Sequence, residues 1–241
     1  MHSTATFSRR KPQIFERRFY LGASLLFAAM VFWTFARTFY LRPLFMAAPL
    51  PLLLHIHGAV MSGWVLLLAV QSGLVSAHRV RWHRWLGMGG AAWAVLVVIL
   101  GSVTTLHAAA REVHNHTAFA PMQVRITGLE LVQMLLFAGF AGTAIWLRRR
   151  TDTHKRLMLL TIACMLPSAL ARLPIGNVTN LFILTGLDLS VVACVGIDTF
   201  RNRRLHPAFA WGAGALLLSI NLAFPATKTH AWIAFGSWLV S

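Results

Sequence analysis

Long apolar runs constrain this chain more than any other feature of its sequence. They are about 20 residues long or longer, which is the length that a helix needs to cross the hydrocarbon core of a bilayer. Hydrophobic residues make up 57% of the 241 residues, and charged residues only 12%. Lipid offers the backbone no hydrogen-bond partner, so each run is expected to be helical. The sequence therefore predicts an all-α fold, a polytopic transmembrane helix bundle.

The apolar runs define about seven expected spans and the segments between them. A basic segment, residues 1–18, precedes a transmembrane domain of residues 19–225, and residues 226–241 are too short to span and indicate an interfacial segment. The spans are expected at residues 19–40, 52–77, 84–109, 122–147, 155–173, 175–200 and 207–224. Pro167 predicts a kink in the fifth of them. The three prolines within residues 41–51 predict an irregular apolar loop.

The distribution of charge predicts how the bundle lies in its membrane. A formal charge of +16 would suggest nucleic acid in a soluble domain, but here Lys and Arg cluster between apolar runs, which excludes that partner and favours anionic membrane lipids. Sixteen of the 22 Lys and Arg residues fall on the side of the N-terminus, and six fall on the other side. The positive-inside rule then predicts a cytoplasmic N-terminus.

One apolar span carries polar residues in a regular register. His57, Trp64, Gln71 and His78 recur every seven residues, so a continuous helix would place them on one stripe. Imidazole and amide groups have no hydrogen-bond partner in lipid, so the stripe is expected to face other helices. We therefore expect the span at 52–77 to be the one around which its neighbours pack.

Candidate chemistry gathers in the half of the bundle that is predicted to be outer. His57 lies near the start of one span and His107 near the end of the next, so the two are expected to meet at the outer leaflet. His55 lies close by but points about 200° around the helix from His57. Glu130 is expected about 12 Å deep on the fourth span.

This set of residues admits three interpretations. His57 and His107 could bind a haem b iron axially, or His55, His57, His107 and Glu130 could supply ligands to a transition metal. The carboxylates of Glu130 and Asp188 could instead form a proton or ion relay in a proton-coupled carrier. In the third interpretation the same groups make only structural polar contacts in a membrane subunit without a cofactor.

Other ionisable residues are expected at two depths. His78, His83, His154 and His206 stand at span ends beside Arg, Lys or Trp, a pattern typical of the headgroup interface, although they leave room for a second, inner site. Asp188 is expected about 20 Å from the outer end of the sixth span, near the middle of the membrane. Its carboxyl either titrates or makes a neutral hydrogen bond to Thr or to the backbone. Cys164 and Cys194 lie in apolar runs and are expected to be free.

Several short motifs carry a resemblance over roughly residues 20–200. FARTFYLRP, HIHG, HRWLG and DTHKRLMLL together resemble an uncharacterised family of bacterial multi-pass inner-membrane proteins. More loosely, the histidines at helix ends are similar to those of membrane proteins linked to cytochrome oxidase assembly and of b561-type di-haem cytochromes. The resemblance implies a respiratory redox or assembly role, with quinone or a respiratory complex as partner. It carries over no catalytic residue.

Overall fold

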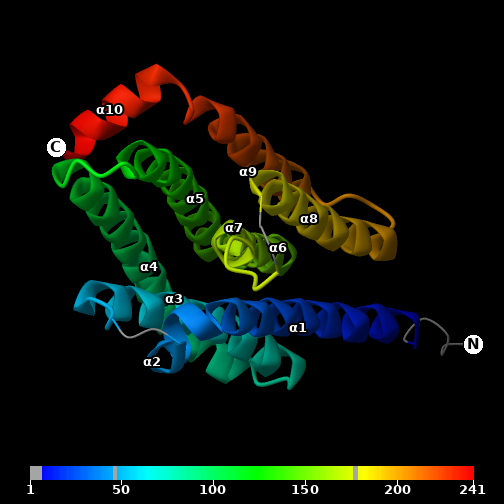
Figure 1. Ribbon diagram of the computed structural model, residues 1–241. Helices are drawn as coiled ribbons and strands as arrows, with labels where there is room; N and C mark the ends of the chain where they lie inside the picture. Colours follow the sequence, from blue (N-terminus) through cyan, green and yellow to red (C-terminus); the bar gives the residue numbers. More distant parts are fainter. Residues whose placement is uncertain (1–6, 46–47, 176–178) are drawn as a thin grey trace, which may run out of the picture.

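Six long helices form the body of the protein. The computed structural model describes residues 7–45, 48–175 and 179–241 (Figure 1). The long helices are α1 (Phe7–Phe35), α3 (Leu52–Ser76), α4 (Val80–His114), α5 (Ala120–Trp146), α8 (Asn180–Asn202) and α9 (Pro207–Ala226). Each is long and apolar enough to cross a membrane, α1 from Glu16 onward together with the π-helical turn η1 (Ala36–Tyr40). The predicted polytopic helix bundle is confirmed.

The predicted fifth span is not one kinked helix but two helices. These are α6 (Thr151–Ala163) and α7 (Leu166–Leu170), with Cys164 and Met165 between them. Pro167 explains the break, because proline has no N–H for the carbonyl four residues earlier and its ring clashes with that carbonyl. The carbonyl in question belongs to Ala163, the last residue of α6. Pro167 therefore ends one helix and begins another, where the sequence predicted only a bend.

The centre of the bundle is α6 rather than α3. Seven of the thirteen residues of α6 are buried, and α6 packs against α1, α5, α8 and α9. Figure 1 shows α6 and α7 in the middle of the molecule, with α5, α8 and α9 on one side and α1 and α3 on the other. The expectation that the helix at 52–77 is central was wrong, because α3 packs mainly against α1 and α4. Residues 157–163 of α6 are apolar on every face except at Thr161, which is typical of an enclosed helix.

The predicted stripe is present on α3 for His57, Trp64 and Gln71 but does not continue to His78. Trp64 is 2% exposed and Gln71 is 8% exposed, and His57 is half-buried. His78 departs from the stripe because α3 ends at Ser76 and His78 adopts a left-handed backbone conformation with φ of 60°. Its exposed ring contacts the Arg17 guanidinium at 2.9 Å.

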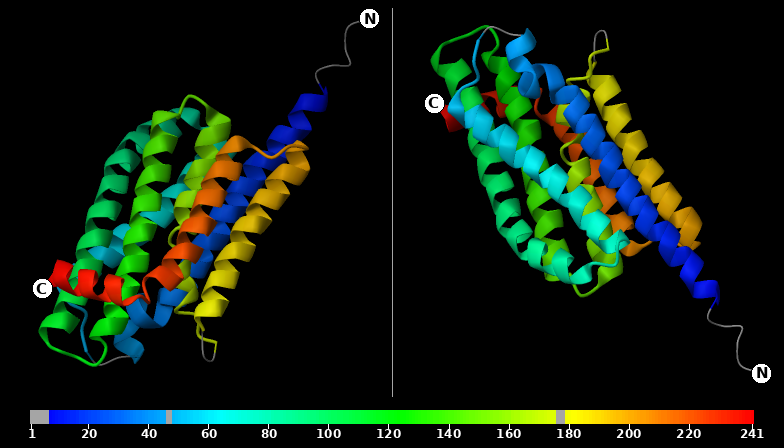
Figure 2. Two further views of the ribbon diagram at one scale, coloured as in Figure 1. Left: turned by 90° about the horizontal axis from the view of Figure 1, so that it is seen from above. Right: turned by 90° about the horizontal axis from the view of Figure 1, so that it is seen from below.

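The connections between helices define two ends of the bundle. The α3–α4, α5–α6 and α8–α9 connections, which carry the Arg clusters, lie at the end from which the N-terminus emerges (Figure 2). We call this the basic end, and the other, where α4 joins α5, the far end. The helix α10 (His230–Val240) lies across the far end, and Trp232 donates a hydrogen bond to the Val124 carbonyl at 3.1 Å. Its eleven residues are too few to span, as expected, and its interfacial position stays a prediction.

Two further points concern local structure. The basic segment before the first span is helical from Phe7 and continuous with α1, while residues 1–6 lie outside the described residues. The predicted irregular loop contains one helical turn, α2 (Arg42–Phe45), and residues 46–47 also lie outside the described part.

Candidate functional site

The three candidate ligand histidines, His55, His57 and His107, do not converge on one point. His57 Nδ1 donates a hydrogen bond to the Leu100 carbonyl of α4 at 3.4 Å. His107 lies seven residues beyond Leu100 on α4, about 10 Å along the axis, and is exposed beside Val240 of α10. The exposed His55 donates to the Pro51 carbonyl at 3.3 Å. Within residues 7–45, 48–175 and 179–241, no group of three or more His, Cys, Asp or Glu side chains is arranged to hold a metal.

Glu130 projects from α5 into a half-buried position against α4. Its carboxylate accepts a hydrogen bond from the Thr105 hydroxyl, and the Thr127 hydroxyl donates to the Thr105 carbonyl at 3.3 Å. Arg172, which follows α7, lies near enough to both Glu130 and His57 to interact with them electrostatically. Arg172 forms no salt bridge with Glu130, and its Nη1 donates instead to the Ser168 carbonyl at 2.8 Å.

Asp188 is shallower than expected and has an amide partner. Because α8 begins at Asn180, Asp188 lies eight residues into the helix, about 12 Å from its start, rather than 20 Å. Residues 176–178 of the predicted span lie outside the described residues. The Asn221 side chain of α9 donates to both carboxylate oxygens, at 3.1 and 3.4 Å. The sequence had suggested Thr or the backbone as the partner.

The contacts of Trp64 fix the depth of Glu130 relative to the helix break. Trp64 donates to Thr161 of α6 at 3.3 Å and packs on Phe137 of α5 with ring centroids 5.1 Å apart, so those two residues lie at one level. Glu130 lies seven residues from Phe137 toward the far end, about 10 Å. The same number of residues beyond Thr161 leads to Ser168, just past the break. Glu130 therefore lies at about the level of the break.

Asp188 lies at nearly the same level on the other side. A Cβ atom on Gly186 would stand 3.0 Å from the Leu170 side chain of α7, so α8 and α7 are in close contact there. Asp188 is two residues further along α8, about 3 Å. Neither Asp188 nor Glu130 forms a salt bridge with any described residue. Two carboxylates without a salt bridge thus flank the break between α6 and α7, with the Arg172 guanidinium near Glu130.

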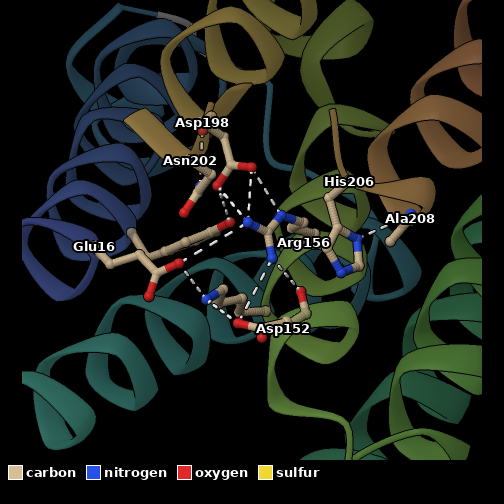
Figure 3. Close-up of polar contacts among 9 residues, drawn as sticks. Glu16, Asp152, Arg156, Asp198, Asn202, His206 and Ala208 are labelled. Atoms are coloured by element: carbon tan, nitrogen blue, oxygen red, sulfur yellow. Dashed lines mark hydrogen bonds and ion pairs between the residues drawn. The ribbon is translucent and has the colours of Figure 1, made fainter. Parts of the chain in front are cut away.

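A buried ion pair lies nearer the basic end, on the first half of α6. The Arg156 guanidinium donates to both oxygens of Asp198 on α8, from Nε and Nη2 at 2.9 Å each (Figure 3). The Arg156 and Asp198 side chains are 3% and 1% exposed. The hydroxyl of Tyr20 on α1 donates to Asp198 Oδ1 at 3.1 Å. This arrangement joins α1, α6 and α8 through one guanidinium and one carboxylate.

A rim of more exposed charges surrounds this pair. Lys155 Nζ lies 2.5 Å from Glu16 Oε1 and 2.6 Å from Asp152 Oδ1. Arg156 Nη1 donates to the Asp152 backbone carbonyl at 2.8 Å, and Glu16 Oε1 is 3.9 Å from Arg156 Nη2. We call this set the ionic cluster; its members are Glu16, Tyr20, Asp152, Lys155, Arg156 and Asp198.

His206, in the α8–α9 connection, lies beside the ionic cluster (Figure 3). Its Nδ1 accepts a hydrogen bond from the Ala208 backbone N–H at 3.1 Å and so caps the start of α9 (Figure 3). Burial, and after it the Arg156 guanidinium, lower the pKa of His206 below its ordinary value, although Asp152 and Asp198 act in the opposite direction. The neutral imidazole is the form that can accept this bond.

Two of the predicted interfacial histidines contact each other between helices. The rings of His83 on α4 and His154 on α6 have centroids 6.4 Å apart, and His154 Nδ1 donates to the Ala144 carbonyl at 2.8 Å. Gln71 finds the partners that its buried position required. Its amide nitrogen donates to the His83 carbonyl at 3.1 Å, and its amide oxygen accepts from the Gly87 N–H at 2.9 Å.

Sequence reasoning missed the most enclosed polar pair of the described chain. Arg156 counted only as one of a basic cluster and Asp198 was not singled out, because their pairing joins residues 42 positions apart. A signal was available, since both charges lie within predicted spans, Arg156 one residue from the start of 155–173 and Asp198 two residues from the end of 175–200, and an unpaired charge there is costly. Cys164 and Cys194 are free, as expected.

Comparisons of the chain with protein-family models, with curated proteins and with solved structures give no match. The resemblances drawn from short motifs therefore stay predictions, and the function has to be argued from the geometry of the two polar regions.

Proposed function

We propose that this protein is a proton-coupled membrane carrier in which Glu130 and Asp188 take up and release protons beside the break between α6 and α7. The break carries the proposal. Secondary transporters often bind their substrates and coupling ions where a spanning helix is interrupted, because irregular backbone at membrane depth is tolerated only inside protein or along a polar cavity. An acid within a spanning helix is by default a functional residue.

The environment of each carboxyl suits reversible protonation. The neutral acid can lie among helices with a single hydrogen bond, whereas the carboxylate needs water or a cation to offset its desolvation. Glu130 has the Thr105 hydroxyl and Asp188 has the Asn221 amide, and neither has a salt bridge. A change of exposure to water would therefore be coupled to gain or loss of a proton. The path would run between α5 and α8 past the end of α6.

Proton flux in liposomes tests this proposal. Purified protein is reconstituted with a pH-sensitive dye inside, and flux is measured under an imposed proton gradient. Glu130→Gln and Asp188→Asn should each lower flux sharply, because an amide cannot titrate. Glu112→Gln is the matched control, since Glu112 lies in the last turn of α4 beside Arg111 and Thr117 and its substitution should leave flux unchanged. Flux that is unaltered in both Glu130→Gln and Asp188→Asn would refute the carrier.

A second experiment addresses the break itself. Pro167→Ala restores the N–H and removes the ring that separates α6 from α7, so it should favour one continuous helix. We expect this variant to be at least as stable to heat as the parent but to lose flux. If Pro167→Ala kept full flux, the helix break would not be required for transport.

One observation favours a competing function, a haem or metal centre. His57 donates its Nδ1 proton to a backbone carbonyl, as metal-binding histidines usually do, which leaves Nε2 free. His107 would have to approach by about two helical turns to share an iron with His57. An optical spectrum of the purified protein separates the two proposals. If the protein showed a haem absorption that was lost in both His57→Ala and His107→Ala, the carrier proposal would give way to that of a redox protein in contact with quinone.

A further inference from the structure

We propose that the ionic cluster is the gate that closes the basic end of the carrier path, an inference that rests on the proposed function. Arg156, Asp198 and Tyr20 place three helices around one buried ion pair between the basic end and the break. The rim charges of Lys155, Glu16 and Asp152 form a second layer toward the surface. Together the two layers join α1, α6 and α8 at this end (Figure 3).

The cluster lies in series with the break. Between the two is a small apolar cavity lined by residues of α1, α6, α8 and α9, among them Ala163, Ser190 and Cys194. Ala163 is the last residue of α6, and Cys194 is one turn from Asp198 on α8. The cavity holds about 10 Å³, at the lower limit of the space that a water molecule needs. Water that passed the cluster would thus enter a dry space leading toward Asp188.

The energetics of the pair suit a two-state gate. A buried ion pair is stable only while both partners and their hydrogen bonds remain in place, and the loss of one partner leaves a charge that draws in water. The rim pairs are partly exposed, Lys155 at 22% and Asp152 at 63%, and such pairs contribute little. Opening therefore depends on the Arg156–Asp198 pair rather than on the rim. The Pro167 break lets α6 move without carrying α7 along.

The native cysteines allow the gate to be tested without measuring transport. A charged methanethiosulfonate reagent is applied to the Cys164→Ala protein in liposomes, and the rate of modification of Cys194 is followed. The rate should be low with the cluster intact. Asp198→Asn should raise it by roughly tenfold, which corresponds to about 1.4 kcal/mol in the opening equilibrium. Asp152→Asn, the exposed carboxylate of the same cluster, should change it little.

Local unfolding is distinguished from gating by the other cysteine. Cys164 is fully buried at the break, and it should stay protected when Asp198→Asn is introduced into the Cys194→Ala protein. Equal exposure of both cysteines would show that the variant has lost its packing and would overturn the gate. An unchanged Cys194 rate in Asp198→Asn would overturn it as well.

A double substitution tests the consequence for transport. Arg156→Leu with Asp198→Leu replaces the ion pair with apolar side chains, a change that is often neutral or stabilising. This variant should fold, modify Cys194 as slowly as the parent and lose flux, because the end can no longer open. Full flux in the double variant would refute the gate. Failure of Glu130→Gln and Asp188→Asn to lower flux would instead refute the carrier, while Cys194 modification would still report on the gate.

Discussion

Replacing Trp64 with alanine should be among the most damaging single changes in the bundle. Trp64 is 2% exposed, packs edge-on against Phe137 and donates to Thr161. Lipid provides little hydrophobic driving force between helices, so the loss is one of packing. Truncation that leaves an unfilled cavity on the order of 100 Å³ costs about 2.4 kcal/mol. The lost interhelical hydrogen bond adds about 0.6 kcal/mol. The expected loss is therefore about 3 kcal/mol.

The assay is reversible unfolding in mixed micelles, followed by circular dichroism. Trp64→Phe keeps most of the ring and should cost much less than Trp64→Ala. Thr161→Val removes the acceptor for Trp64 together with the hydroxyl's own hydrogen bond to the Met158 carbonyl, and the lost interhelical bond should cost about 0.6 kcal/mol. The matched control is Trp211→Ala on α9, where the ring is 82% exposed and the change should stay within about 0.5 kcal/mol. If Trp64→Ala proved no more harmful than Trp211→Ala, the packing argument would be wrong.

Three further outcomes are expected. Gln71→Leu should lower the free energy of unfolding by about 1–3 kcal/mol, because its partners on α4 lose their hydrogen bonds; an unchanged melting temperature would contradict this. Gly128→Ala should destabilise, because its Cβ would lie 2.6 Å from side-chain atoms of Thr227 and Trp232, whereas Gly139→Ala, with open space, should stabilise by about 0.5–1 kcal/mol. Folding lowers the pKa of His206, so stability should be complete above about pH 6.5 and fall as the pH drops toward the folded value. His206→Asn keeps a cap without titrating, and it should flatten the decline in melting temperature between roughly pH 8 and pH 5.

The sequence was a good guide to the long helices because their evidence is local. Apolar length and flanking charge are properties of one continuous segment, and a segment such as Leu52–Ser76 matches its predicted span to within a residue. The same reasoning located Trp64 and Gln71 on an inward face, since a seven-residue spacing needs no knowledge of the neighbouring helices. It failed at His78, where the chain turns after α3 has ended.

The arrangement of helices was harder to predict, because it depends on contacts between distant segments. Burial of seven of its residues places α6 at the centre, but residues 155–173 were predicted only as one span among seven, because nothing local shows which span the others surround. Pro167 was predicted to kink the fifth span but breaks it into two helices. A kink and a break start from the same missing hydrogen bond, so the local sequence does not distinguish them. His57, His107 and Glu130 lie in the half of the bundle in which they were predicted, whereas Asp188, expected near the middle of the membrane, lies nearer the far end, and the four do not converge on one metal site.

The Arg156–Asp198 pair also bears on how the chain enters its membrane during synthesis. Arg156 leaves the ribosome 42 residues before Asp198, several seconds at typical elongation rates of roughly 5–20 residues per second. An arginine at the centre of a membrane helix costs about 2.5–3.5 kcal/mol on the translocon scale, and α6 is only about 20 Å long. During that interval the acids of the ionic cluster already present are Asp152 of α6 itself, 3.8 Å from Arg156, and Glu16 of α1, which in the finished fold lies 3.9 Å from Arg156 and contacts Lys155. Glu16 would thus act as a temporary counter-ion that holds α6 beside α1 until α8 arrives, so its removal should lower the yield of correctly inserted chains more than the stability of those already assembled.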